Sequence, residues 1–302
     1  MPDKAPKPWK MMLPLAIVLG LAVLWASYWL VASRFVEQKF AAERARLAAQ
    51  GLTLTCTEEA WGGFPFRFEF ICSSPVLTAT VRAEARSGRL HLVALAYAPW
   101  QIAALVDGPT TVAAAGLAPT VAEHQRALAA FTFGSDGKAS FSAEVPALSV
   151  SGHGRAGRVM AHGRPASRGT DVALSLSDIV WEPQGRPPLK IAQAELLGTL
   201  TAESALRIDR VELKQGNLRY WGSGMLRLDE SRRLAGMLET ETNDLDGLLA
   251  LVAPHLQIDG GDSANLRTMM TLLGESARLP IIAKDGALYI GPFKIADLAP
   301  LY

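Results

Sequence analysis

Histidine and cysteine are the side chains that most often bind metals or attack substrates, and this 302-residue chain has five of the first and two of the second. Among the histidines, only His153 and His162 lie near each other in the sequence. A metal site needs three or four ligands that converge in space, and no acidic residue accompanies this pair. We therefore interpret both histidines as loop residues, and the sequence predicts neither a metal nor another cofactor.

The segment 134–138 (GSDGK) is the stretch most similar to a phosphate-binding loop. That motif requires serine or threonine after the lysine, and Ala139 stands there instead. The string Gly-x-Ser-x-Gly, which forms the turn that presents a nucleophilic serine, does not occur in the sequence. We predict a hairpin turn over 134–138 and a protein that is not an enzyme.

The composition is that of a folded protein. Hydrophobic residues make up 49% of the chain and charged residues 20%, so the apolar surface is sufficient for a core, in one or two domains at this length. The formal net charge is +1. Because nucleic-acid binding depends on a basic surface that neutralises phosphates, we expect no nucleic-acid partner.

Residues 11–33 carry no charged side chain and are bounded by Lys10 and Arg34. About 20 apolar residues cross the hydrocarbon core of a bilayer. Aromatic residues, which favour the membrane interface, gather toward the end of this run: Trp25, Tyr28 and Trp29. The sequence therefore predicts a cytoplasmic tail over 1–10 and a transmembrane helix over 11–33.

A cleavable signal peptide is the alternative interpretation of this run, because Val31 and Ser33 are small enough to precede a cleavage site. Signal-peptide cores are about 7–15 residues long and are rarely closed by aromatic residues. The run here is longer and ends in Trp and Tyr, so we favour an anchor that is retained.

Cys56 and Cys72 flank a strand-like segment, with Gly62-Gly63 as a turn between them. A lone pair in this arrangement is typical of a disulfide in an oxidising compartment, and two buried thiols are the alternative. A bond that closes a loop of about 15 residues stabilises a fold by about 3 kcal/mol. We expect a single-pass protein of a bacterial inner membrane with residues 34–302 in the periplasm.

The exported part begins with a helical pattern that changes to an alternating one. Residues 34–50 are rich in Ala, Glu, Arg and Leu and end before Gly51, which predicts a stalk helix. Residues 51–302 predict a periplasmic domain in which most segments alternate apolar and polar side chains, as strands do. The most regular part, 206–243, predicts a meander, and Asp285-Gly286 predicts a further hairpin turn.

Two amphipathic segments near the end, 244–253 and 263–273, predict short helices with Asp244 and Ser263 as N-caps. Together these patterns predict a mainly β fold with some α. We expect a transmembrane helix and stalk, then a large antiparallel, curved β-sheet domain with two short C-terminal helices.

The segment 151–170 is rich in glycine and predicts a loop that joins two halves of the domain. It contains four arginines and no acidic residue. Guanidinium groups pair with the phosphates of lipid headgroups, although a solvated loop explains the same composition. The candidate headgroup contacts are Arg155, Arg158, Arg164 and Arg168.

Phenylalanines occupy every second position over 64–70, which predicts a strand with four rings on one face. Such rings are most often core, packed on an opposing sheet or on the stalk helix. The alternative is a groove that accepts acyl chains. The candidate lining residues are Phe64, Phe66, Phe68 and Phe70.

These features together resemble the family catalogued as domain of unknown function 2125, which consists of membrane-anchored envelope proteins. The resemblance rests on the single N-terminal span ending in aromatics, the string 62–67 (GGFPFR) between the cysteines, the stretch 99–109, and the closing turns 285–286 and 291–292. A fainter likeness, of architecture alone, is to AsmA-like envelope proteins, which are linked to lipid transport and outer-membrane assembly.

The resulting hypothesis is a non-catalytic envelope protein that binds or handles lipid. The alternative is a structural scaffold that recruits an envelope protein partner. The two differ in whether the isolated protein carries lipid or carries protein.

Overall fold

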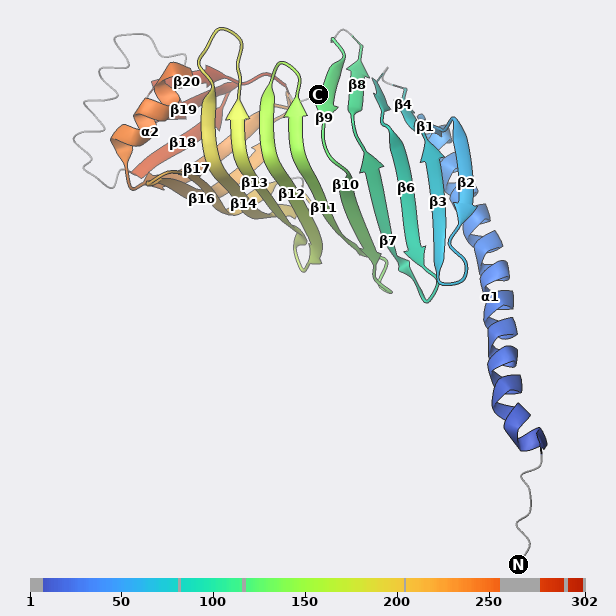
Figure 1. Ribbon diagram of the computed structural model, residues 1–302. Coiled ribbons are helices and arrows are strands. Elements are labelled where there is room, and N and C mark those ends of the chain that lie inside the picture. Colours follow the sequence, from blue (N-terminus) through green and yellow to red (C-terminus); the bar gives the residue numbers. More distant parts are fainter. Residues whose placement is uncertain are drawn as a thin grey trace, which may run out of the picture. The chain divides into compact units, whose positions relative to one another are not determined.

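A computed structural model of the chain describes residues 8–80, 83–115, 118–203, 205–255, 278–290 and 293–300. The chain forms two compact units. Unit 1 contains residues 1–106 and 112–118, and unit 2 contains residues 107–111 and 119–302. Antiparallel strands make up most of both units, as the sequence predicts (Figure 1).

Unit 1 begins with α1 (Pro8–Ala49), in which the predicted transmembrane and stalk segments form one helix. Its apolar part is long enough to cross a membrane. The helix ends at Ala49, and the turn after it contains Gly51, whose φ of +87° is accessible to glycine without steric cost. Side chains at 12–24 are exposed on all sides, whereas partly buried side chains recur every three or four residues from Trp25 to Leu47. Only this second part therefore packs on the sheet.

The strands of unit 1 run antiparallel to their neighbours. β3 pairs with β2 and β6, and β4 pairs with β1 and β5. Their bounds are β1 Leu52–Thr55, β2 Glu58–Gly62, β3 Arg67–Ser73, β4 Val76–Ala79, β5 Ala83–Arg86, β6 Arg89–Leu95, β7 Ala98–Asp107 and β8 Thr110–Ala114.

The predicted disulfide is confirmed: Cys56 and Cys72 are bonded, with their Cα atoms 5.3 Å apart. The prediction of a strand from Phe64 is wrong at its start, because residues 63–66 form a turn and β3 begins at Arg67. Pro65 explains the late start, since it has no N–H to donate to a strand ladder.

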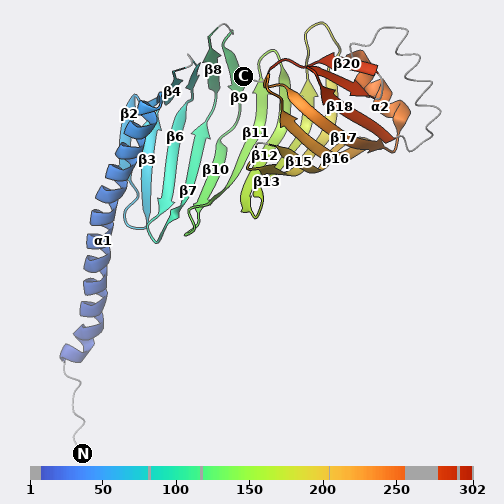
Figure 2. The same ribbon diagram turned by 180° about the vertical axis from the view of Figure 1, so that it is seen from behind.

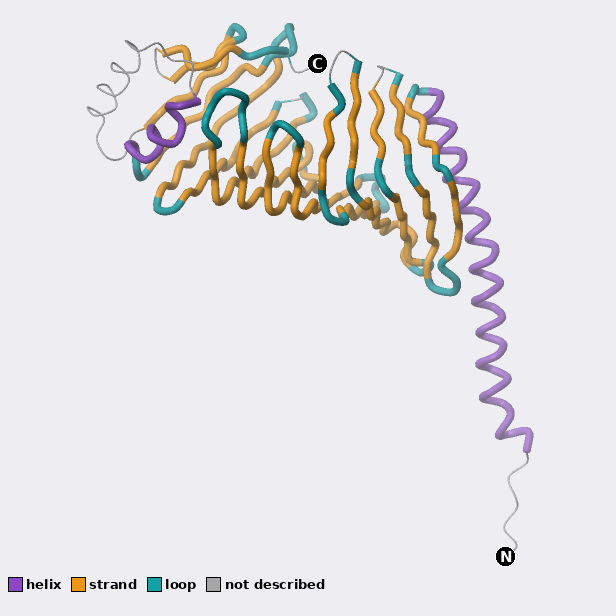
Figure 3. The backbone as a smooth tube through the Cα atoms, turned by 45° about the horizontal axis from the view of Figure 1, so that its top comes forward, coloured by secondary structure: helices purple, strands orange, loops and turns teal. Residues whose placement is uncertain are grey.

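Unit 2 is an antiparallel meander in which each strand from β10 to β20 pairs with the next. Figures 2 and 3 show β18–β20 across from β12 and β13, with β16 and β17 between them. The bounds are β9 Thr120–Glu123, β10 Ala127–Phe133, β11 Ala139–Val150, β12 Gly154–Ala166, β13 Gly169–Trp181, β14 Leu189–Thr201, β15 Leu206–Gln215, β16 Leu218–Leu228, β17 Leu234–Thr242, β18 Arg278–Lys284, β19 Ala287–Ile290 and β20 Phe293–Asp297.

Several predicted elements of unit 2 are confirmed. The predicted meander over 206–243 corresponds to β15, β16 and β17, and Asp285-Gly286 forms the turn between β18 and β19. Helix α2 (Leu245–Val252) begins after Asp244, whose side chain accepts a hydrogen bond from the Gly247 N–H, and a 3-10 turn (Ala253–His255) follows it. The other predicted helix, 263–273, lies outside the described residues.

The prediction of a loop over 151–170 is wrong, because most of this segment is strand β12. Its glycines do not form a bend. They make room for atoms of the neighbouring strands. A Cβ atom on Gly163 would lie 2.2 Å from the Phe141 ring of β11, and one on Gly154 would lie 2.0 Å from the Val180 carbonyl oxygen of β13. The division between the two units falls at residues 107–119.

Candidate functional site

Phe68 and Phe70, two of the four candidate lining residues, lie in the core of unit 1. Their side chains are 5% and 2% exposed. The Phe68 ring centroid lies 6.0 Å from that of Trp29, and the Phe70 centroid lies 4.6 Å from that of Phe40. Both rings therefore fill the contact between β3 and α1.

Phe64 and Phe66 precede β3 and are 58% and 60% exposed. Each still touches α1 at one side. The Phe64 ring meets the Trp29 ring edge-on at 5.2 Å, and the Phe66 ring lies 6.3 Å from the Trp25 ring. The four phenylalanines thus form a buried pair on the strand and an exposed pair on the turn before it.

The four candidate arginines belong to β12 and to the turn after it. Arg168 is exposed in that turn. The others form ion pairs with N–O distances of 3.6, 3.0 and 3.2 Å: Arg155 with Glu182, Arg158 with Glu144, and Arg164 with Asp171. Because carboxylates from neighbouring segments neutralise these three, the surface here is less basic than the sequence of β12 alone indicates.

The strongest pattern in unit 2 is a division of its side chains between two faces. Residues paired directly across antiparallel strands share a face, and so do residues i and i+2. Three consecutive rows across β11–β15 contain only apolar residues and glycine. They are Phe141–Gly163–Val172–Gly198–Ile208, Ala143–Ala161–Leu174–Leu196–Val211 and Val145–Val159–Leu176–Ala194–Leu213. We call these residues the apolar face.

The apolar face is partly open, although Ile208 at its edge is buried. Leu174 at its centre is 38% exposed and Phe141 at its margin is 39% exposed. Within the part of the chain that the structure describes, Ala156 is the only non-glycine apolar residue of β11–β14 that is buried. Helix α2 packs on the continuation of this face at β16, where Leu248 contacts Leu218. The face is therefore covered at one end and partly exposed in the middle.

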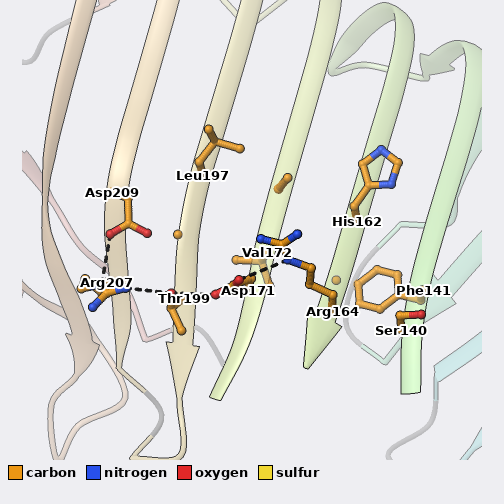
Figure 4. Close-up of a pocket in the computed structure, with 13 residues that line it drawn as sticks. Ser140, Phe141, His162, Arg164, Asp171, Val172, Leu197, Thr199, Arg207 and Asp209 are labelled. Atoms are coloured by element: carbon orange, nitrogen blue, oxygen red, sulfur yellow. Dashed lines mark hydrogen bonds and ion pairs between the residues drawn. The ribbon is translucent and has the colours of Figure 1, made fainter. Parts of the chain in front are cut away.

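The opposite side of the same strands is polar and holds a depression of about 630 Å³ (Figure 4). A chain of interactions crosses it. Asp171 pairs with Arg164 at 3.2 Å and accepts a hydrogen bond from the Thr199 hydroxyl at 3.1 Å. Arg207 donates to the Thr199 hydroxyl at 3.1 Å and pairs with Asp209 at 3.0 Å. The charges of the two arginines and the two aspartates cancel.

Among the residues of unit 2 that the structure describes, Glu212 on β15 is the most deeply buried acidic one, with a side chain 1% exposed. Arg210, Arg219 and Lys214 surround it, and the Lys214 amine lies 3.4 Å from its carboxylate. Burial alone raises the pKa of Glu212, but the hydrogen bonds and charges of Arg210 and Arg219 outweigh it and lower the pKa below its ordinary value. The carboxylate is therefore ionised and occupied by its partners.

The described ranges contain no group of three or more His, Cys, Asp or Glu side chains placed to hold a metal ion. No motif in the sequence marks the residues of the apolar face. Their signal is ordinary strand alternation, visible in Val172, Leu174 and Leu176, but strand alternation cannot tell an open face from a covered one.

The chain has no match among curated proteins and none among solved structures. A family model, described as an uncharacterized protein conserved in bacteria (DUF2125), matches residues 29–299. The match covers both units and part of α1, which agrees with the resemblance drawn from the sequence. Because it extends over most of the sequence, the chain belongs to the DUF2125 family.

Proposed function

We propose that this protein is a single-pass inner-membrane protein that binds lipid acyl chains on the apolar face of a curved, periplasmic β domain. In this proposal α1 crosses the membrane and unit 2 binds the acyl chains. The protein acts by binding and not by catalysis.

The anchor is supported by α1, whose residues 12–24 present apolar side chains on all sides to their surroundings. Lipid tails are the environment in which such a surface is stable. The Cys56–Cys72 disulfide supports a periplasmic location for the β domain, because disulfides persist in oxidising compartments.

The partly exposed apolar face is the observation that carries the proposal. Five strands spaced about 4.8 Å apart make a surface about 19 Å wide. Soluble proteins rarely leave a contiguous apolar surface of this size without a ligand or partner. The bend of the strands of unit 2 in Figure 3 supports a curved domain, and the proposal places the apolar face on its inner side.

Binding without catalysis is supported by the pairing of the charged groups. In the polar depression the ionic groups of Arg164, Asp171, Arg207 and Asp209 hold one another, and Glu212 is held by its cationic neighbours. A general acid or base needs a group that is free to exchange a proton with a substrate.

Photo-crosslinking tests the proposal with two leucines that differ mainly in the face they occupy. Leu174 lies on the apolar face and is 38% exposed, and Leu197 lies on the polar face of the next strand and is 42% exposed. Each is replaced in the full chain by the photoreactive residue benzoylphenylalanine, and adducts formed in cells are identified by mass spectrometry. We expect phospholipid or lipopolysaccharide adducts at position 174 and none at 197.

Equal lipid labelling at the two positions would contradict a specific face. Protein adducts at 174 in place of lipid would support the alternative, a scaffold that recruits an envelope partner. Because both positions are already exposed, neither replacement disturbs a buried core.

A further inference from the structure

Three exposed aromatic residues of unit 1 lie in two turns at one end of its sheet. Residues 63–66 join β2 to β3 and carry Phe64 and Phe66, and the turn between β6 and β7 carries Tyr97, which is 63% exposed. The Ala96 N–H donates to the Phe66 carbonyl at 2.8 Å, which joins the two turns directly. We call residues 63–66 and 96–97 the aromatic turns.

Three side chains of α1 hold the aromatic turns beside the middle of the helix (Figures 1 and 2). The indole of Trp25 donates to the Pro65 carbonyl, the Tyr28 hydroxyl donates to the Ala96 carbonyl, and the indole of Trp29 donates to the Arg67 carbonyl, each at 2.9 Å. The height of these turns relative to the helix is therefore fixed.

The aromatic turns therefore lie beside a part of α1 that belongs to its apolar run. The helix rises about 1.5 Å per residue, so a hydrocarbon core of about 30 Å takes about 20 residues. Counted from Lys10, that length ends near Leu30. The residues that hold the aromatic turns, 25–29, thus precede the end of the apolar run.

We infer that the aromatic turns insert into the outer boundary of the bilayer, where Phe64, Phe66 and Tyr97 contact lipid. This inference rests on the proposed membrane anchor. Aromatic side chains favour this interfacial zone, where an apolar ring meets lipid and a polar atom meets water or a backbone group. Two of the three rings, Phe64 and Phe66, lie against the rings of Trp29 and Trp25 on α1.

The hydrogen bonds of the turns fit this location. In lipid a backbone carbonyl without a donor costs several kcal/mol. Here donors from α1 and from neighbouring strands satisfy the carbonyls of Gly63, Pro65, Phe66 and Ala96. Pro65 also has no N–H that would need an acceptor. Water is therefore not required to solvate these groups.

Benzoylphenylalanine tests the inference at four single positions of the full chain, which is reconstituted in vesicles of phosphatidylethanolamine and phosphatidylglycerol. Phe66 and Tyr97 are the test positions. Val18 in the exposed part of α1 is the positive control for the anchor, and Leu77 on β4 is an exposed control near the other end of α1. All four side chains are exposed, so each variant keeps its core.

We expect lipid adducts at positions 18, 66 and 97, with yields at 66 and 97 several times that at 77. Adducts at 18 without adducts at 66 and 97 would overturn the inference and leave the anchor intact. No adducts at 18 would overturn the anchor and the inference with it. Labelling at 77 as strong as at 66 would also overturn the inference, because the turns would then be no closer to lipid than the rest of the sheet.

Discussion

Both units have strands with an apolar face, but this face is buried in unit 1 and partly exposed in unit 2. In unit 1 the face that carries Phe68 and Phe70 lies under α1, and both rings are buried. In unit 2 the apolar face has Leu174 at its centre with more than a third of its surface exposed. A strand with alternating residues can build either arrangement, so the difference depends on whether another element covers it. The covered face stabilises unit 1, and the partly exposed face is the one that we propose binds lipid.

The largest expected effect is the difference in the loss of stability between two substitutions by alanine, one at a buried residue and one at an exposed residue. Phe70→Ala removes a ring that is 2% exposed and leaves a cavity against α1, which costs about 3–5 kcal/mol. Leu174→Ala removes an exposed side chain and should cost less than about 1 kcal/mol. Hydrogen-exchange mass spectrometry of the full chain in detergent micelles measures both, unit by unit. Similar losses for the two variants would mean that the open face is packed after all.

The disulfide allows a second test of unit 1. Replacing both Cys56 and Cys72 by alanine opens a loop with a sequence separation of 16. The chain-entropy model predicts a loss of about 3 kcal/mol. Exchange should accelerate in β2 and β3 and remain unchanged in β13 and β14. Treating the unmodified protein with a reductant should reproduce the pattern, and a change spread over both units would argue against separate stabilisation.

Glu212→Gln probes the polar side of unit 2. The variant should lose about 2 kcal/mol at neutral pH, because a neutral amide replaces a carboxylate that accepts charge-assisted hydrogen bonds. The lowered pKa means that the carboxylate stabilises the fold above its ordinary pKa, and that this stabilisation disappears as the pH falls through the lower folded-state pKa.

Urea unfolding at a series of pH values checks this sign. The stability difference between the unmodified protein and the Gln variant should shrink steadily as the pH is lowered below about 4. A difference that stays constant would show that the ionised state of Glu212 does not matter for stability.

The smallest expected effect belongs to the surface ion pairs. The Arg164 side chain is 78% exposed although it pairs with Asp171. Arg164→Ala should change the free energy of unfolding by less than about 1 kcal/mol, since exposed pairs gain little in water. It should also leave lipid crosslinking at position 174 unchanged. Loss of that crosslinking would connect the two faces of the sheet and weaken the comparison.

Local patterns in the sequence predict local structure well in this protein. Alternation identifies β15, β16 and β17, and the short-range chemistry of Asp244 and of Asp285-Gly286 identifies a helix start and a turn. These features depend on residues within a few positions of one another. The glycines of β12 are misleading because their role is to make room for partners on other strands, such as the ring of Phe141 beside Gly163.

The candidate site is less predictable for the same reason. The phenylalanines over 64–70 are visible in the sequence, but which of them is buried depends on where α1 lies. Trp25 and Trp29 look like ordinary interfacial residues, and their hydrogen bonds to Pro65 and Arg67 join positions about forty residues apart. The openness of the apolar face likewise depends on what the other elements leave uncovered.

Because α1 is continuous, its length fixes the distance between its exposed segment and the sheet of unit 1. The helix runs without a break from the exposed segment 12–24 to the residues that hold the aromatic turns. Each residue added to or removed from 12–24 would change the distance along the helix axis between the start of this segment and those turns by about 1.5 Å. The number of residues in 12–24 therefore sets the distance between the start of this segment and the sheet of unit 1. A continuous helix fixes that distance, whereas a flexible linker would not.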